Sequence, residues 1–277
     1  MAEKLDDTRI GIIGAGAMGG AVAAGLLASG IPTASIRVSD PDPDRRKTLG
    51  ESRGIRCGAD NREVVEQSDL VVLAVKPNQV TRVLRELGGA GNASLARPLW
   101  VSIAAGVSLS SLAGDLPPGA RLVRSMPNTP ALVGEAATAF VANAEATEAD
   151  RVAARLLFEA LGTAWEAPSE ELLDAVTGLS GSGPAYVFVF LEALGDAGVR
   201  MGLPREAAYL LATQTVLGAA RLALESGRHP ASLRDQVTSP GGTTIAGLER
   251  LEAAGFRSAI HDAVEAATRR ARELGGR

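Results

Sequence analysis

Three glycines near the amino terminus have the spacing of a phosphate-binding turn. Gly14, Gly16 and Gly19 form the pattern G-x-G-x-x-G between a short apolar segment and a run typical of a helix. In such a turn the first glycine allows the bend, the second lets a pyrophosphate approach the backbone, and the third lets helix and strand pack closely. Free N–H groups at the helix start would then face the phosphates. A glycine-rich helix packed on a sheet without a ligand is the alternative, and the context favours a dinucleotide site.

A second candidate contact to a dinucleotide is Asp40, the last residue of the next expected strand, 35–40. An acidic residue at this place accepts hydrogen bonds from the adenosine ribose and disfavours a 2′-phosphate, whereas a nearby arginine favours the phosphate. The sequence supplies both signals, because Asp40 is followed by Arg45. The run Asp40–Asp44 could instead form a turn and cap the next helix at Asp44. The local sequence therefore leaves the choice between NAD and NADP open.

A third motif could bind a carboxylate. Residues 239–244 read Ser-Pro-Gly-Gly-Thr-Thr and stand directly before another expected helix. Free N–H groups at the start of a helix suit an anionic group. An ordinary threonine N-cap after a glycine turn explains the same residues, and the pattern alone favours that explanation.

Other single polar residues have two interpretations each. Lys76, at a strand end, could be a catalytic acid or could position a cofactor through its backbone. Glu170 could bind a substrate, although an exposed glutamate in the first turn of a helix is the ordinary explanation. His229 and His261 show no spacing for triad or metal chemistry. Two histidines and one cysteine, Cys57, do not suffice for the usual Cys/His zinc site. A carboxylate-only metal site is the alternative, but nothing in the sequence suggests it, so we expect no metal.

The segments that must position these residues alternate between strand and helix over the first 166 residues. The uninterrupted apolar run 69–75 is typical of a parallel sheet covered on both faces. Ligands bind beyond the carboxyl ends of such strands, where the small residues Ala104 and Ala105 would leave room for a flat ring. The pattern predicts a doubly wound α/β domain over 1–166. We expect strands at 9–13, 35–40, 69–75, 99–104, 121–124, 138–141 and 163–166, and a helix at 148–161.

The remaining domain, 167–277, is expected to be entirely helical, with helices at 170–176, 184–199 and 204–225. The stretch 207–220 carries no charged residue, and a helix that is apolar all round is buried on all sides. Such burial is difficult within about 110 residues, so we expect a second subunit to complete this domain. A central helix in a monomeric bundle is the alternative.

Composition limits the class and compartment of the protein. The chain has 277 residues, of which 46% are hydrophobic, and this excludes a disordered chain. Its net charge of −4 argues against nucleic-acid binding, and one cysteine gives no sign of an oxidising compartment. The uncharged run Ile10–Ile31 has the length of a membrane span, but its glycines have the phosphate-binding spacing. We therefore expect a cytoplasmic protein without a membrane segment.

Taken in order, these motifs resemble the 1-pyrroline-5-carboxylate reductase family from Arg9 to about Leu274. The resemblance rests on GIIGAGAMG at 11–19, AVKP at 74–77, SIAAGV at 102–107, RSMPNTPALV at 124–133, DAVTGLSGSGPAYVF at 174–188 and VTSPGGTTIAGLE at 237–249. It implies a Rossmann-like NAD(P)-binding domain and an all-helical domain that forms a homodimer, often within larger assemblies of dimers. It also implies hydride transfer from NAD(P)H to the C=N carbon of 1-pyrroline-5-carboxylate, which gives L-proline in the last step of proline biosynthesis. NADPH is the commoner donor in the family, and NADH is possible.

The resemblance also assigns roles to individual residues. The pyrophosphate would lie on Gly14, Ala15, Gly16, Ala17, Met18 and Gly19. Further cofactor contacts would be Asn61 on the adenosine side, Ala74, Val75, Lys76 and Pro77 at the nicotinamide-side ribose, and Ala104 and Ala105 beside the nicotinamide. The substrate carboxylate would bind the backbone of Ser239, Gly241, Gly242, Thr243 and Thr244.

Three residues complete this assignment. The Thr244 hydroxyl would reach the ring nitrogen of the substrate, which makes it the candidate catalytic residue. Glu170 falls where the family has an acid in the substrate site. Asp40 is a departure, because NADPH-using relatives often have serine or threonine there; strict NADPH preference is therefore in doubt, although Arg45 could compensate.

Two other functions are compatible with parts of the sequence. A related imine or β-hydroxyacid reductase would carry a lysine or aspartate as acid in the helical domain, and no such residue has a convincing setting. A protein that only senses NAD(P) would not need the motif at 239–244.

Overall fold

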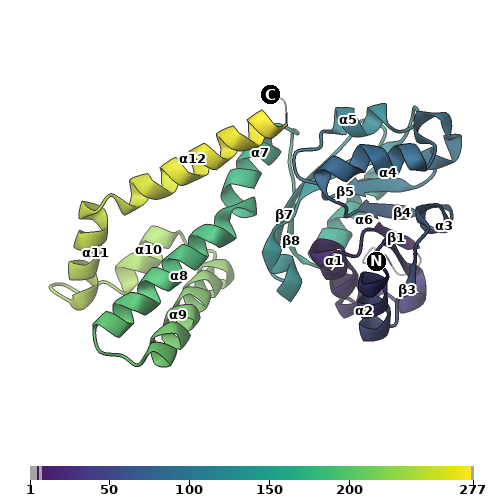
Figure 1. Cartoon of the computed structure of the whole chain (residues 1–277). Helices are drawn as coiled ribbons and strands as arrows, with labels where there is room; N and C mark the ends of the chain where they lie inside the picture. The colour runs from purple at the N-terminus through teal and green to yellow at the C-terminus, as the bar shows by residue number, and fades with distance from the viewer. Residues whose placement is uncertain (1–4, 6–7, 276–277) are drawn as a thin grey trace. The chain divides into compact units, whose positions relative to one another are not determined.

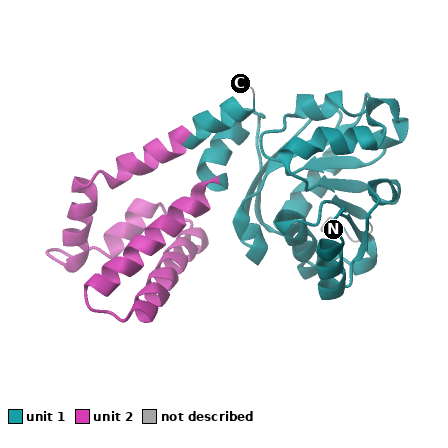
Figure 2. Ribbon diagram, viewed as in Figure 1, with its two compact units in different colours: residues 1–181, 267–277 teal, residues 182–266 magenta. Residues whose placement is uncertain are grey.

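The computed structural model describes residue 5 and residues 8–275 and divides the chain into two compact units (Figure 2). Unit 1 contains the described residues up to Gly181 together with 267–275, and unit 2 contains residues 182–266. These limits differ from the expected domains 1–166 and 167–277. Residues 167–181 and the end of the last helix belong with the sheet, because they pack against its strands and loops.

Unit 1 is built on an eight-stranded sheet of order β3-β2-β1-β4-β5-β6-β7-β8 (Figure 1). Strands β1 to β6 run parallel, β7 is antiparallel to β6, and β8 is parallel to β7. The strands are β1 (Ile10–Ile13), β2 (Ile36–Ser39), β3 (Arg56–Gly58), β4 (Leu70–Leu73), β5 (Leu99–Ser102), β6 (Arg121–Met126), β7 (Ala136–Ala142) and β8 (Gly162–Glu166). The predicted doubly wound α/β sheet is thus confirmed. Only β3 was not expected, because Arg-Cys-Gly offers no apolar run.

Alternate residues of the central strands enter two different cores, which explains their uninterrupted apolar sequences. In β1, Ile10 and Ile12 pack in one core and Ile13 in the other. The first core is closed by α1 (Ala17–Ala28), α2 (Pro43–Arg53) and α6 (Glu148–Glu159). The second is closed by α3 (Asn61–Glu66), α4 (Val80–Glu86) and α5 (Leu109–Gly114). The uncharged run at 10–31 therefore forms a buried strand and a helix that packs on it.

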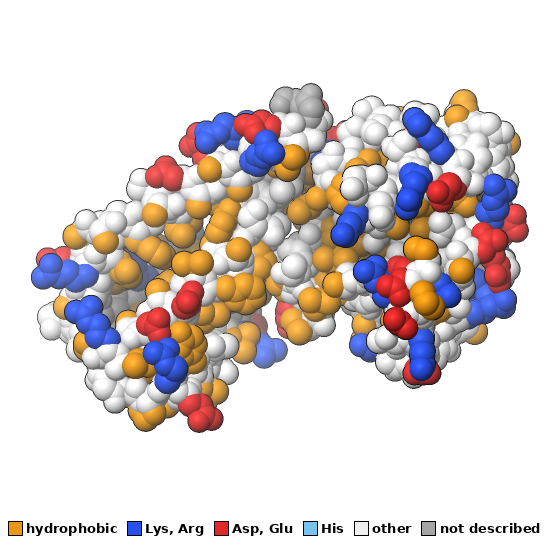
Figure 3. Space-filling view, in the orientation of Figure 1, with side chains coloured by type: hydrophobic (Ala, Val, Ile, Leu, Met, Phe, Trp, Pro, Cys, Tyr) orange, Lys and Arg blue, Asp and Glu red, His pale blue; other side chains and the backbone are white. Residues whose placement is uncertain are grey.

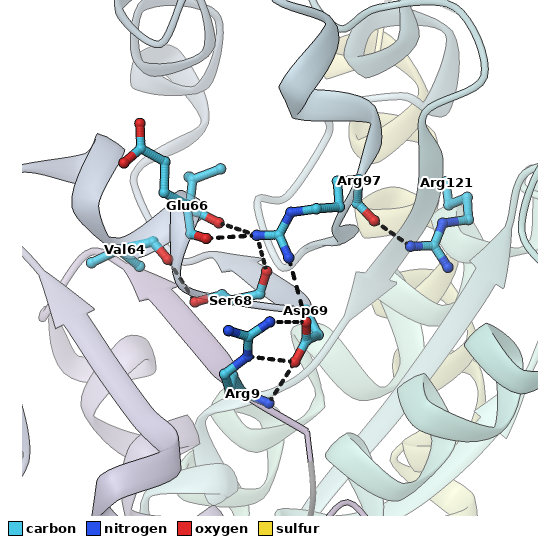
Figure 4. A network of polar contacts seen from close by, with 8 residues as sticks. Arg9, Val64, Glu66, Ser68, Asp69, Arg97 and Arg121 are labelled. Carbon is cyan, nitrogen blue, oxygen red and sulfur yellow. Dashed lines mark hydrogen bonds and ion pairs between the residues drawn. The ribbon is translucent and has the colours of Figure 1, made fainter.

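A network of ion pairs joins the amino ends of the strands (Figure 4). This edge of the sheet is opposite to the turn at Gly14–Gly19, which we call the glycine turn. Asp69, just before β4, binds Arg9 through Nη2–Oδ1 at 2.6 Å and Nε–Oδ2 at 2.9 Å. Arg97 lies 3.4 Å from Asp69 Oδ1 and donates to the Ser68 carbonyl at 2.8 Å. The hydrogen bond from the Arg9 side chain is the main reason why the pKa of Asp69 is lowered, and the charges of Arg9 and Arg97 add to it. These contacts fix the register of β1, β4 and β5 from one end.

Unit 2 is helical, as expected, and no strand occurs between residues 167 and 275. It contains α8 (Gly183–Arg200), α9 (Arg205–Ser226), α10 (Pro230–Gln236), α11 (Thr243–Ala253) and most of α12 (Phe256–Leu274). The short helix α7 (Leu172–Val176) belongs to unit 1. Helices α8 and α9 pack closely because Gly195 lets the Tyr209 ring approach; a Cβ on Gly195 would lie 3.0 Å from that ring.

Most of α9 is uncovered within the single chain. Of its residues, only Ala208 and Ala212 are buried in the described structure. Five leucines on it are between 53% and 80% exposed: Leu210, Leu211, Leu217, Leu222 and Leu224. Hydrophobic side chains are spread over the visible face of unit 2 (Figure 3). Among the described helices, α9 is also the one whose length and composition would allow it to cross a membrane. Because so few residues of α9 are buried, this helix is not the central helix of a monomeric bundle.

Candidate functional site

The glycine turn joins β1 to α1 at the carboxyl edge of the sheet, and the protein's own packing explains two of its three glycines. Gly14 has φ +107°, donates to the Ser39 carbonyl at 2.7 Å, and would place a Cβ 2.7 Å from the Ala74 carbonyl oxygen. A Cβ on Gly19 would overlap the Gly14 carbonyl oxygen. Both residues must be glycine for the backbone to close this turn.

Gly16 is different, because nothing in the protein crowds it. Its φ is −70°, and a Cβ built there would approach only Arg45 Nη1, at 4.0 Å. A cavity of about 420 Å³ opens at this point, lined by the first residues of α1 and by Asp44, Arg45 and Thr48 of α2. A glycine that the fold does not require, at the open start of a helix, fits close approach of a pyrophosphate.

Asp40 fastens the glycine turn to the end of β2. Its carboxylate is 4% exposed and accepts from Ala15 N at 2.7 Å and from Asp42 N at 2.9 Å. Arg45 lies 3.8 Å from Asp40 Oδ2, and about half of its side chain is exposed. The N-cap of α2 is Asp42 rather than the expected Asp44, because the Asp42 carboxylate accepts from the N–H groups of residues 44 and 45. Asp40 thus binds backbone, while Arg45 borders the space above Gly16.

The residues assigned to the rest of the cofactor site surround the same edge. Asn61, the first residue of α3, accepts a hydrogen bond from Ser39 Oγ at 2.7 Å, which places it at the end of β2. Ala74 donates to the Ile13 carbonyl at 2.8 Å and lies against Gly14 and Gly19. Lys76 is exposed and Pro77 opens a short 3₁₀ turn. The structure therefore brings the adenosine-side and ribose-side candidates together around the glycine turn.

A second cavity, of about 390 Å³, lies beyond the carboxyl ends of β4, β5 and β6, and we call it the β4–β6 cavity. It is lined by Pro77, Ala105, Gly106, Val107, Arg124, Asp174, Thr177, Ala271 and Leu274. Of the two alanines expected beside the nicotinamide, Ala105 lines this cavity, while Ala104 is 2% exposed and packs in the second core. A small-residue wall with charged groups suits a flat polar ring.

Glu170 is neither exposed nor in a helix. It lies in the turn before α7, and its Oε1 accepts from Arg124 Nη1 at 2.6 Å and from Leu109 N at 2.8 Å. Its side chain is 22% exposed and that of Arg124 is 4% exposed. Arg124 was not among the sequence candidates. The available signal was an arginine directly after the apolar pair Leu122-Val123, in the part of the strand that the structure buries.

The Ser-Pro-Gly-Gly-Thr-Thr loop lies in unit 2, whereas the cofactor candidates lie in unit 1. Helix α11 begins at Thr243 with Gly242 as its N-cap and without a side-chain cap, so the threonine N-cap explanation is wrong. Gly241 has φ +68°, and a Cβ on Gly242 would overlap Ser239 Oγ. The hydroxyls of Thr243 and Thr244 therefore do not cap the helix. The first N–H groups of α11 have no acceptor within the helix.

The remaining candidates have structural roles or none. His229 caps α10, because its Nδ1 accepts from Ala231 N at 3.2 Å. His261 lies on the exposed face of α12. Over residue 5 and residues 8–275, no group of three or more His, Cys, Asp or Glu side chains is arranged to hold a metal ion.

Comparisons with known proteins agree with this geometry. Residues 170–274 match the family model for pyrroline-5-carboxylate reductase dimerisation, and residues 9–106 match that for coenzyme F420-dependent NADP oxidoreductase. The chain is 50% identical to a pyrroline-5-carboxylate reductase of Synechocystis sp., covering 96% of this chain and 98% of the relative. It is 47% identical to that of Methanosarcina acetivorans, covering 98% and 99%.

Solved structures give the same result. A pyrroline-5-carboxylate reductase from Coxiella burnetii superposes with a TM-score of 0.91 at 39% identity, covering 96% of this chain and 98% of the other. A pyrroline carboxylate reductase from Plasmodium falciparum with NADP bound gives a TM-score of 0.86 at 32% identity, covering 98% and 100%.

Proposed function

This chain belongs to the pyrroline-5-carboxylate reductase family, and we propose how its residues share that reaction. The enzyme is an oxidoreductase that reduces 1-pyrroline-5-carboxylate to L-proline with NADP(H), the last step of proline biosynthesis. The observation that carries this function is similarity that runs through both units, the substrate loop included, rather than through the cofactor half alone.

We propose that residues 1–166 form the cofactor-binding domain and that 167–277 serve dimerisation and substrate binding, although 167–181 and 267–275 pack with the sheet in unit 1. The open backbone at Gly16 supports a pyrophosphate site at the start of α1. The end of β2 would hold the adenosine ribose, with Arg45 as the cation available to a 2′-phosphate and Asp40 as the anchor of the turn. The proposed cofactor contacts are Gly14, Ala15, Gly16, Ala17, Met18, Gly19, Asp40, Arg45, Asn61, Ala74, Val75, Lys76, Pro77, Ala104 and Ala105.

The loop before α11 would bind the substrate. Its backbone N–H groups at Gly241 to Thr244 suit a carboxylate, because the start of a helix attracts negative charge. The uncapped geometry leaves the Thr244 hydroxyl available to the ring nitrogen of the imine. Since an imine can be protonated before it binds, the reaction needs orientation more than a strong protein acid. NADPH, when bound, supplies the hydride.

We propose that a second copy of the chain covers α9. A helix that carries five leucines, each more than half exposed, is typical of a surface that another protein covers, and residues 170–274 match a dimerisation domain. A homodimer, and larger assemblies built from dimers, would bury this helix in protein, which is why we place the enzyme in the cytoplasm rather than on a membrane. Light scattering on the purified chain without detergent should give at least twice the monomer mass of 28.4 kDa; a detergent-dependent monomer would contradict the proposal.

The activity itself is tested by incubating the purified chain with 1-pyrroline-5-carboxylate at neutral pH and following NADPH and NADH oxidation together with proline formation. We expect one proline for each NADPH consumed. No turnover with either donor would reject the function, and the ratio of the two rates measures the donor preference.

A further inference from the structure

The carboxylate of Glu170 joins three separate segments around the β4–β6 cavity. Its Oε1 accepts from Leu109 N, the first residue of α5, at 2.8 Å and from Arg124 Nη1, on β6, at 2.6 Å. Glu170 itself lies in the turn that leads into α7, whose Asp174 lines the cavity. One oxygen atom thus ties together the β5–α5 loop, β6 and the start of α7.

The segment held by Leu109 is the one that shapes the cavity. Residues 105–107 line it, and Gly106 takes φ +76° to turn the chain there. The loop has few other anchors: Val107 N to the Ala104 carbonyl at 3.4 Å is long for a hydrogen bond. The contact from Leu109 N to Glu170 therefore fixes the position of Ala105 and Gly106 relative to β6.

Arg124 brings a cation to the same cavity. Its side chain is 4% exposed, yet it lines the cavity wall. Within the described residues, its ion pair is with Glu170 through Nη1. A guanidinium has five N–H donors in a fixed plane, so the bond to Glu170 orients the group and leaves donors for a carbonyl oxygen.

We propose that Arg124 contacts the carboxamide of the nicotinamide ring and that Glu170 is a positioning residue, which holds both Arg124 and the β5–α5 loop in place for it. The inference rests on the proposed function, because that function places the nicotinamide beside Ala105. It assigns Glu170 a role in cofactor binding instead of the substrate contact expected from the sequence. The reason for this change is that Glu170 Oε1 already accepts two hydrogen bonds, from Leu109 N and from Arg124 Nη1.

The test compares Glu170→Gln with Glu166→Gln. Glu166 is the matched control, because it is also 22% exposed and pairs with arginines, Arg151 at 2.5 Å and Arg155 at 2.9 Å. Unlike Arg124, the partner of Glu170, these two arginines do not line the cavity. The glutamine at 170 keeps the size of the side chain and removes its charge. NADPH and adenosine 2′,5′-bisphosphate, which lacks the nicotinamide, are each titrated into the full chain without substrate.

We expect Glu170→Gln to weaken NADPH binding about tenfold, the scale of one charge-assisted hydrogen bond. Binding of the bisphosphate should stay within about twofold of the unsubstituted chain, and Glu166→Gln should bind both ligands normally. Glu170→Asp, which keeps the charge, should recover part of the loss.

Two results would overturn the proposal. Equal weakening of both ligands by Glu170→Gln would indicate a general loosening of the fold. Normal NADPH binding with a raised KM for 1-pyrroline-5-carboxylate would indicate direct substrate contact. Neither result bears on the function itself, which turnover by the unsubstituted chain tests separately.

Discussion

Replacing Gly16 by alanine tests whether this glycine is needed for cofactor binding rather than for packing of the fold. A Cβ at this position meets only Arg45 Nη1 at 4.0 Å, and φ −70° suits any residue. Alanine at an N-cap costs about 0.5–1 kcal/mol relative to better caps, while loss of the glycine's freedom in the unfolded chain returns about 0.4–1 kcal/mol. The free energy of unfolding without cofactor should therefore change by less than about 0.5 kcal/mol.

NADPH binding by the same variant should fall sharply. The methyl group would stand where a phosphate oxygen reaches the backbone, and a charge-assisted hydrogen bond is worth about 1.5–3 kcal/mol. At about 1.4 kcal/mol for each factor of ten, the Kd for NADPH should rise roughly 10- to 100-fold. The assay is NADPH titration by fluorescence, paired with thermal unfolding of the cofactor-free chain.

Gly19→Ala is the matched comparison. Its Cβ would overlap the Gly14 carbonyl oxygen, so the backbone must move, at a cost of about 1–3 kcal/mol. This variant should lose several degrees of Tm without any cofactor present. An unchanged Kd for NADPH in Gly16→Ala would refute the pyrophosphate assignment, and a Tm loss as large as that of Gly19→Ala would refute the statement that Gly16 is uncrowded.

Three further predictions concern other parts of the chain. Thr244→Ala should lower kcat/KM by roughly one to two powers of ten, the scale of a lost positioned donor, without changing the Tm; wild-type kinetics would remove Thr244 from the mechanism. Arg45→Ala should lower kcat/KM with NADPH and leave that with NADH nearly unchanged, because only NADPH has the 2′-phosphate; equal losses would contradict this. Since the pKa of Asp69 is lowered in the folded state, its contribution to stability is present above about pH 4 and lost as the pH falls through the folded pKa. Asp69→Asn should therefore destabilise the chain to urea at pH 7 and flatten the loss of stability below about pH 4, whereas Glu51→Gln, at an exposed pair, should do neither.

The sequence predicted the sheet well because its strands are buried on both faces. Runs such as 70–73 are apolar at every position, and each feeds both cores. β3 escaped prediction because an edge strand of three residues needs little apolar side chain. The turn at Gly14–Gly19 was predicted equally well, because backbone geometry requires glycine at positions 14 and 19.

Features that depend on distant contacts were not predictable. The part-buried pair of Arg124 with Glu170 joins residues 46 positions apart. The N-cap at Asp42 is a local contact, but Asp44 was an equally good candidate for the cap. The limits of the compact units also depend on tertiary packing, because residues 267–275 return to unit 1 at the far end of the chain. The exposure of α9 agrees with the sequence argument that one chain does not bury it.

The central claim is hydride transfer from the nicotinamide to the C=N carbon of 1-pyrroline-5-carboxylate. NADPH carrying two deuterium atoms at C4 of the nicotinamide tests it directly when the chain is supplied with unlabelled substrate. We predict L-proline with one deuterium on the ring carbon that was doubly bonded to nitrogen, in proportion to the NADPH consumed. Proline without deuterium, or NADPH oxidation without proline, would contradict the account.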